Sequence, residues 1–165
     1  LLSLLKQKPT KIFAIDFSSE AIKISKKLFK KEKNISFIKS SVTKMPFKDE
    51  SFDIIISRYI LNNLNEKERK KAVHELYRLL KNDGKIFFED FSIEDFRYNS
   101  KNKQKLIENN TFTKENGIIC HFFEKKEIEN LFNKFSRLKI KKISFQPIKL
   151  KLNLNRVIFS GIIEK

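Results

Sequence analysis

Short apolar runs alternate with segments of helical periodicity through the first two thirds of the chain, and this alternation constrains the fold most strongly. Apolar runs typical of strands in a parallel sheet stand at 11–16, 35–39, 52–57 and 85–91. The run at 52–57 is almost wholly apolar, so we expect both of its faces to be covered. Two further runs, at 140–145 and 157–163, predict an antiparallel C-terminal strand pair. The pattern as a whole predicts an α/β three-layer sandwich.

Capping signals place helices between these strands. Ser18 offers an N-cap hydroxyl to a helix that follows the first strand. Asn65 and Glu68 stand in the capping-box relation, and an apolar stripe at helical spacing follows them. We expect this second helix to end at 82–84, where Gly84 supplies the conformational freedom of the turn. A third helix is predicted from the spacing of Ile128, Leu131, Phe132 and Phe135.

The chain contains no internal repeat, low-complexity block or Gly/Ser/Pro linker. Residues 1–165 are therefore expected to form a single domain. Within it, residues 92–123 are polar, weakly periodic and longer than an ordinary connection between elements. This segment is predicted to be a lid or a substrate loop.

A formal charge of +16 suggests a polyanionic partner such as nucleic acid. The 36 basic residues comprise 30 lysines and only 6 arginines, however, and the lysines are spread along the whole chain. Arginine is the residue preferred for forked contacts to phosphate, whereas lysine is a solvated point charge. We therefore favour a solvated basic surface over a dedicated nucleic-acid face, and charge alone names no partner.

Cysteine usage, histidine usage and hydropathy argue against several other classes of protein. With one cysteine, Cys120, and two distant histidines, His74 and His121, we expect neither an intramolecular disulfide nor a metal site. The apolar runs are far shorter than a membrane span, and no pattern of a secretory signal is recognisable. These features predict a cytoplasmic chain with no membrane partner.

Three segments resemble motifs of one known family. Residues 14–22 (AIDFSSEAI), 45–57 (MPFKDESFDIIIS) and 75–85 (ELYRLLKNDGK) are similar, in order and spacing, to motifs of class I S-adenosylmethionine (SAM)-dependent methyltransferases of the methyltransferase type 11 kind. The resemblance covers roughly half of the chain. It implies a Rossmann-like three-layer fold with a mostly parallel sheet and an antiparallel C-terminal strand pair, and it implies SAM as the cofactor.

The resemblance also implies that the sequence is an N-terminally incomplete fragment. The family's Gly-rich GxGxG loop after the first strand is absent, since the three glycines stand at 84, 117 and 161. The missing first strand is central in the family's sheet, between the strands at 11–16 and 52–57. Its loss is expected to leave two apolar strands with unpaired edges, and to leave this chain with weak SAM binding or none.

The resemblance assigns the cofactor-binding residues to the carboxyl ends of the strands, where ligands of open parallel sheets collect. Asp16 is expected to accept hydrogen bonds from both ribose hydroxyls; the alternative is that it merely caps the strand end. Ser41 stands where the family usually has an acid that accepts the adenine amino group, and Val42 is expected to pack on the ring. Ser57 and Arg58 are expected at the methionine end and the substrate entrance. The predicted cofactor-binding set is Asp16, Phe17, Ser41, Val42, Ser57 and Arg58.

The methyl group of a sulfonium is already activated, so aligning it with the acceptor is the main task, and many such enzymes use no base. If a base is used, Glu89, Asp90 and His121 are the candidates. The alternative for Glu89 and Asp90 is solvation of a strand end. The alternative for His121 is a hydrogen-bonded histidine beside an aromatic core.

The leading prediction is that the protein transfers a methyl group from SAM to an unidentified acceptor. The acceptor is a small molecule, an RNA or a protein. Whether this shortened chain is itself active is left open. The second hypothesis is a non-catalytic interaction module with the methyltransferase fold, favoured by the missing glycines and by Ser41. The third is a basic RNA-binding protein, which only the charge supports, because no RNA-binding motif accompanies it.

Overall fold

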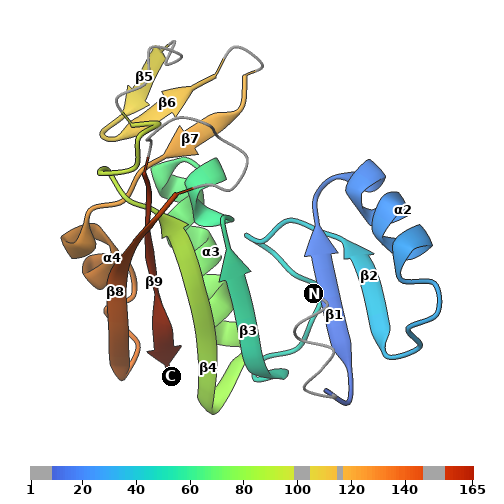
Figure 1. Ribbon diagram of the computed structural model, residues 1–165. Helices are drawn as coiled ribbons and strands as arrows, with labels where there is room; N and C mark the ends of the chain where they lie inside the picture. Colours follow the sequence, from blue (N-terminus) through green and yellow to red (C-terminus); the bar gives the residue numbers. More distant parts are fainter. Residues whose placement is uncertain (1–8, 99–104, 115–116, 147–154) are drawn as a thin grey trace. The chain divides into compact units, whose positions relative to one another are not determined.

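The computed structural model describes residues 9–98, 105–114, 117–146 and 155–165 (Figure 1). The chain forms two compact units, Leu1–Pro46 and Phe47–Lys165. Both units combine strands with helices, as the alternating pattern of the sequence predicted.

The first unit is a strand–helix–strand element. It consists of β1 (Ile12–Asp16), α2 (Ser19–Leu28) and β2 (Ile35–Lys39). The two strands run parallel, and Asp16 lies opposite Lys39 at their carboxyl ends. Helix α2 begins where the sequence predicted, because the Ser18 hydroxyl accepts a hydrogen bond from the Ala21 N–H at 3.2 Å. Ile22 is the buried residue on its apolar side.

A mixed four-stranded sheet forms the body of the second unit. Its strands are β3 (Phe52–Arg58), β4 (Leu80–Phe91), β8 (Arg137–Phe145) and β9 (Arg156–Glu164), in the order β3-β4-β9-β8. β3 and β4 are parallel, whereas β9 runs antiparallel to both β4 and β8. The predicted antiparallel C-terminal pair is therefore confirmed. Ile86, Phe88 and Ile163 of the central strands are almost fully buried.

Helix α3 (Glu66–Leu79) begins with the predicted capping box. The Asn65 side chain accepts a hydrogen bond from the Glu68 N–H at 2.9 Å, and the Glu68 carboxylate accepts one from the Asn65 N–H at 3.1 Å. Ala72 and Leu76 of the apolar stripe are buried. Both the start of this helix and its buried side follow from local sequence signals.

Helix α3 ends at Leu79, earlier than the predicted 82–84, and residues 82–84 lie within β4. Asp83 adopts the left-handed conformation there, with φ at 62°, so the predicted turn does not depend on the freedom of Gly84. A Cβ on Gly84 would lie 2.8 Å from the Leu80 side chain. Gly84 is required by the lack of space and not by the turn.

Helices cover one face of the sheet. Two further helical segments complete the second unit, η1 (Leu61–Asn63) and α4 (Lys125–Leu131). The rings of Phe123 and Phe132, on either side of α4, pack edge-on against Phe88 of β4, with centroids 6.3 Å and 5.4 Å away. Tyr77 of α3 packs in the same way against Phe135, at 5.1 Å. Aromatic contacts thus join α3, α4 and the sheet into one core.

The opposite face of β3 and β4 is partly exposed. Ile54, Ile56 and Phe87 are 53%, 51% and 41% exposed. They alternate along the strands with the buried Ser57 and Phe88, as side chains on opposite faces of a sheet must. The prediction that both faces of the run at 52–57 are covered is therefore wrong.

In the described part of the chain, β1 and β3 each have one edge without a partner strand, as predicted for the runs at 11–16 and 52–57. β1 pairs with β2 alone, and β3 pairs with β4 alone. Each of these parallel pairs consequently ends in an apolar strand that has one open edge.

The described residues within 92–123 include regular structure where a loop was predicted. They contain a three-stranded antiparallel sheet of β5 (Lys105–Glu108), β6 (Thr111–Thr113) and β7 (Ile119–His121). This small sheet lies beyond the carboxyl ends of β3 and β4 (Figure 1). The Phe123 N–H donates to the Phe91 carbonyl at 2.7 Å and so fixes the end of the segment to β4. In the described residues, no helix has both the length and the apolar character needed to cross a lipid bilayer.

Candidate functional site

Four of the predicted cofactor residues lie together at the carboxyl ends of β1 and β2. The Ser40 N–H donates to the Asp16 carbonyl at 3.0 Å, which brings the two strand ends side by side. Asp16 Oδ1 accepts a hydrogen bond from the Ser18 N–H at 2.8 Å, and Oδ2 has no partner among the described residues. Phe17 is 78% exposed next to it. The strand end therefore presents one carboxylate oxygen that is available to a ligand.

The serine predicted at the adenine rim forms a local turn. Ser41 Oγ accepts from the Thr43 N–H at 3.2 Å and lies 2.8 Å from the Thr43 hydroxyl. The Lys44 N–H donates to the Ser41 carbonyl at 3.2 Å. Val42, between them, is half-buried. The Ser41 hydroxyl thus holds the backbone of this turn, and the packing of Val42 on adenine stays a prediction.

The other predicted cofactor residues, Ser57 and Arg58, lie at the end of β3 in the second unit. Ser57 is buried, and its hydroxyl has no hydrogen-bond partner among the described residues. Arg58 Nε donates to Glu89 Oε2 at 2.5 Å, and this hydrogen bond raises the pKa of the guanidinium. Of the three candidate bases, Glu89 is therefore already engaged in an ion pair with a residue of the predicted site.

Asp90, the second candidate base, is completely buried at the end of β4. Its carboxylate accepts hydrogen bonds from the Asn62 N–H at 3.1 Å and from its neighbour Phe91 N–H at 3.0 Å. Burial raises its pKa from 3.8 to about 7, against the opposing effect of these hydrogen bonds. Asp90 fixes the η1 turn to the end of β4, and near neutral pH its carboxyl group exchanges a proton.

The raised pKa of Asp90 predicts a stability that declines towards neutral pH. The folded protein binds the proton more tightly than the unfolded chain, so the stabilisation is complete below pH 4 and is lost as the pH approaches 7. Between pH 5 and pH 7 we expect Asp90 to lower the free energy of unfolding by about 2 kcal/mol. Urea titrations at both pH values measure this, with Asp90→Asn expected to lose the decline and the exposed Glu32→Gln to keep it. An equal decline in both variants would assign the pH dependence to other groups.

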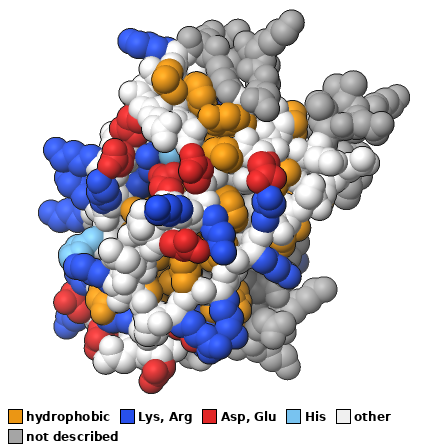
Figure 2. Space-filling view, turned by 90° about the vertical axis from the view of Figure 1, so that its left-hand side faces the viewer, with side chains coloured by type: hydrophobic (Ala, Val, Ile, Leu, Met, Phe, Trp, Pro, Cys, Tyr) orange, Lys and Arg blue, Asp and Glu red, His pale blue; other side chains and the backbone are white. Residues whose placement is uncertain are grey.

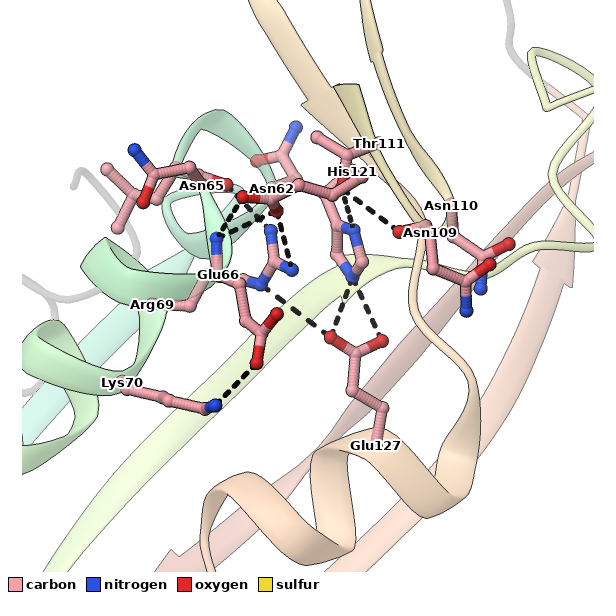
Figure 3. Close-up of polar contacts among 12 residues, drawn as sticks. Asn62, Asn65, Glu66, Arg69, Lys70, Asn109, Asn110, Thr111, His121 and Glu127 are labelled. Atoms are coloured by element: carbon pink, nitrogen blue, oxygen red, sulfur yellow. Dashed lines mark hydrogen bonds and ion pairs between the residues drawn. The ribbon is translucent and has the colours of Figure 1, made fainter. Parts of the chain in front are cut away.

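His121, the third candidate base, is held in a polar network between β6, β7 and α4 (Figure 3). Its Nδ1 lies 2.7 Å from the Thr111 hydroxyl, and its Nε2 lies 3.0 Å from the Glu127 carboxylate. The ring is 1% exposed and packs edge-on against Phe123 at 4.4 Å. Both ring nitrogens therefore have protein partners, as expected of a histidine that serves packing.

The same network extends to Arg69 of α3. Arg69 is 3% exposed and donates through Nη1 to the Leu64 carbonyl at 2.7 Å. Its other nitrogens lie 3.5 Å from Glu108 of β5 and 3.6 Å from Glu127 of α4. Figure 3 shows Arg69 and His121 both directed towards the Glu127 carboxylate. Arg69 thus joins the small sheet to the helices of the body.

Two arginines that were not predicted lie near the site: Arg97, six residues after the end of β4, and Arg156, the first residue of β9. Arg97 and Arg156 surround the stacked rings of Tyr59 and Phe91, together with the predicted Arg58. No sequence spacing relates these positions. The available signal was composition, because a chain with 30 lysines keeps arginine at only six positions.

Charge and cavities add little to these sites. On the face seen in Figure 2, basic and acidic side chains are interspersed and no single basic patch dominates. A groove of about 630 Å³ runs between α3 and α4, with His74, Tyr77 and Glu127 among its lining residues. It contains none of the six predicted cofactor residues, so we do not assign it to SAM.

Comparison with known proteins identifies similar domains. The family described as "Methyltransferase domain" matches residues 1–88. The chain is 26% identical over 126 residues to the tRNA N(3)-methylcytidine methyltransferase Mettl2 of Drosophila melanogaster, covering 73% of this chain and 39% of the relative. It is 36% identical over 85 residues to the demethylmenaquinone methyltransferase of Renibacterium salmoninarum, covering 52% of this chain and 34% of the relative. The chain thus spans well under half the length of these curated relatives.

A solved structure extends the likeness to the whole chain. The crystal structure of a SAM-dependent methyltransferase from Methanosarcina mazei superposes with a TM-score of 0.75 at 20% sequence identity. The superposition covers 100% of this chain and 86% of that protein. The predicted Rossmann-like α/β fold is confirmed by this likeness.

Proposed function

Because this chain belongs to the family of methyltransferase domains, we propose that it carries out SAM-dependent methyl transfer, alone or as part of a longer protein. The observation that supports this most directly is the carboxyl end of β1, where Asp16 holds one oxygen in a local hydrogen bond and leaves the other available. A carboxylate in this position suits the paired hydroxyls of a ribose, since charge-assisted hydrogen bonds are about twice as strong as neutral ones.

Val42 belongs to the same unit as Asp16 and is proposed to contact the adenine ring. Val42 offers an apolar surface to the adenine ring at the turn after β2. Ser57 lies in the second unit, and its buried hydroxyl has no partner in the described part of the chain; its role at the methionine portion is proposed from the motif alone. SAM, when bound, supplies an activated methyl group, and the protein's task is to orient the acceptor and exclude water.

A dedicated base is not part of this proposal. Glu89 is paired with Arg58, and His121 is bonded at both ring nitrogens. Asp90 is buried behind backbone N–H groups and is better suited to positioning η1. Alignment of the acceptor is therefore the source of the rate enhancement that we assign to this site.

RNA is the acceptor class that we propose to test first. The alignment with the tRNA methyltransferase of Drosophila covers 126 residues, so it extends beyond the 88 residues matched by the family. The alignment with the quinone methyltransferase covers only 85 residues. Residues 92–123, beyond the carboxyl ends of β3 and β4, are proposed to contact it.

Asp16→Ala tests the cofactor assignment. We expect the Kd for S-adenosylhomocysteine to rise at least tenfold, which corresponds to about 1.4 kcal/mol, because the ribose loses its acceptor. Isothermal titration of the 165-residue chain measures this, and Glu32→Ala, which removes an exposed acid of the same unit, serves as the control. Equal affinities in Asp16→Ala and the unchanged chain would contradict the ribose assignment. Absence of binding by every variant is the result expected if the cofactor needs the Gly-rich loop; absence of binding also by a version extended upstream would favour the non-catalytic interaction module.

A further inference from the structure

An arginine–aromatic cluster, formed by Arg58, Tyr59, Phe91, Arg97 and Arg156, lies at the carboxyl ends of β3 and β4. The rings of Tyr59 and Phe91 stack with centroids 4.7 Å apart. The guanidinium groups of Arg97 and Arg156 lie 3.7 Å and 5.1 Å from the Phe91 centroid, and that of Arg58 lies 5.1 Å from the Tyr59 centroid. Three cations therefore converge on one aromatic surface.

The buried carboxylate of Asp95 lies beside Arg97 and Arg156, and all of its hydrogen-bond acceptor sites are occupied. Oδ1 accepts from the Arg97 N–H at 3.1 Å and from Arg97 Nε at 2.7 Å. Oδ2 accepts from Arg97 Nη2 at 3.1 Å and from the Val157 N–H at 3.1 Å. A carboxylate offers about four lone-pair sites, so none remains for Arg156. Arg156 Nε lies 3.9 Å from Oδ2, beyond hydrogen-bonding distance.

Arg156 is consequently short of an acceptor. Its Nε is buried and has no hydrogen-bond partner within the described residues, while the side chain as a whole remains 26% exposed. Burial, followed by the positive charge of Arg97, lowers the pKa of Arg156. The acid at the end of β4, Glu89, is already paired with Arg58. Three cations thus share two carboxylates.

We infer that the arginine–aromatic cluster binds a phosphate group, with Arg156 and the Nη1 group of Arg97 holding the oxygens and Arg58 at the rim. A guanidinium fork matches phosphate oxygens in a bidentate geometry, and a partly buried fork binds them more strongly than one in water. The Tyr59–Phe91 stack beside it offers an aromatic surface of the kind on which unpaired bases stack. That this phosphate belongs to the methyl acceptor rests on the proposed function.

The phosphate could come from a free nucleotide or from an RNA strand, and the chemistry at the guanidinium groups is the same. The two sources differ in salt dependence. Each phosphate contact of a polyanion releases condensed counterions, so losing one contact lowers the salt slope of RNA binding by about one. A mononucleotide shows no comparable slope.

Nuclear magnetic resonance of the arginine Nε–H groups tests the site in the unaltered 165-residue chain. We expect inorganic phosphate and cytidine monophosphate to shift the Arg156 and Arg97 signals saturably, and acetate at equal ionic strength to leave them in place. Absence of a saturable shift, or an equal shift with acetate, would overturn the inference. SAM is absent from this titration, so its failure is distinct from a failure of the Asp16 test.

Arg156→Gln and Arg137→Gln form a matched pair for binding measurements. Arg137 is an arginine of the neighbouring strand β8 that is 57% exposed. We expect Arg156→Gln to raise the Kd for cytidine monophosphate at least tenfold and to lower the salt slope of single-stranded RNA binding by about one. Arg137→Gln is expected to leave both quantities unchanged. A tenfold effect confined to the mononucleotide assigns the site to free nucleotides. Equal affinities in the two variants would overturn the inference. Arg156→Lys, which keeps the charge and loses the fork, replaces Arg156→Gln if that variant does not fold; it is expected to weaken binding of cytidine monophosphate and to leave the salt slope unchanged, and an unchanged affinity would overturn the inference.

Discussion

Replacing Arg69 with methionine is expected to lower the free energy of unfolding by about 3 kcal/mol, the cost typical of removing one partner from a buried charge network. Arg69 is almost fully buried, and its guanidinium lies between the Leu64 carbonyl, Glu108 and Glu127. Methionine fills a similar volume, so the loss comes from Glu108 and Glu127, whose carboxylates then lack the cation that lies beside both. Because the side chains of Glu108 and Glu127 are 27% and 32% exposed, water solvates them in part and reduces the cost of losing the cation. We therefore expect the low end of the loss of about 3–5 kcal/mol that is typical of a broken buried ion pair.

Lys70→Met is the matched control for this prediction. Lys70 is the next residue of α3, is 66% exposed, and forms an i,i+4 ion pair with Glu66. Its replacement is expected to change the free energy of unfolding by less than about 0.5 kcal/mol. Chemical denaturation measures both variants, and hydrogen exchange should show faster exchange in β5–β7 only in Arg69→Met. Equal effects of the two substitutions would mean that Arg69 does not hold the small sheet to the body.

Gly161→Ala is expected to destabilise the chain by about 3 kcal/mol or to prevent folding. Gly161 lies in β9, opposite Phe88 of β4 and Ile140 of β8. A Cβ at this position would lie 2.1 Å from the Lys139 carbonyl oxygen and 2.8 Å from the Ile140 Cα. Both atoms belong to the backbone of a paired strand, so relief requires β8 to move away from β9.

Ser160→Ala, at the preceding position of β9, is the control for Gly161→Ala. This change adds no atoms and is expected to alter stability by less than about 0.5 kcal/mol. Thermal unfolding measures both variants. An unchanged midpoint for Gly161→Ala would show that β8 accommodates a methyl group, and the close approach of the two strands would then have no energetic consequence.

The features that the sequence predicted correctly depend on short-range signals. The capping box at Asn65 and Glu68 and the N-cap at Ser18 each involve residues three apart, so local pattern specifies them fully. The strand at 52–57 was placed correctly, but its exposed face was not. An apolar run shows that a segment is a strand without showing what packs on it.

The small sheet of 105–121 was not predicted, because its strands are three or four residues long and carry no readable alternation. The arginine–aromatic cluster was missed for a different reason. Its members come from three separate places in the chain, and only the pairing of β9 with β4 brings Arg156 beside Phe91. The roles of Asp16 and Ser41 came from motif resemblance, and the parallel pairing of β1 with β2 explains why they share a strand end.

The open edge of β3 bears on how the chain behaves in solution. Within the described residues β3 pairs with a strand on one side only, and Ile54 and Ile56 are half-exposed; a strand edge of this kind is a template on which a second molecule can add a strand. The net charge of +16 opposes that encounter through mutual repulsion. Salt shortens the reach of this repulsion to about 10 Å at 0.1 M, so colloidal stability of the isolated chain decreases as ionic strength rises.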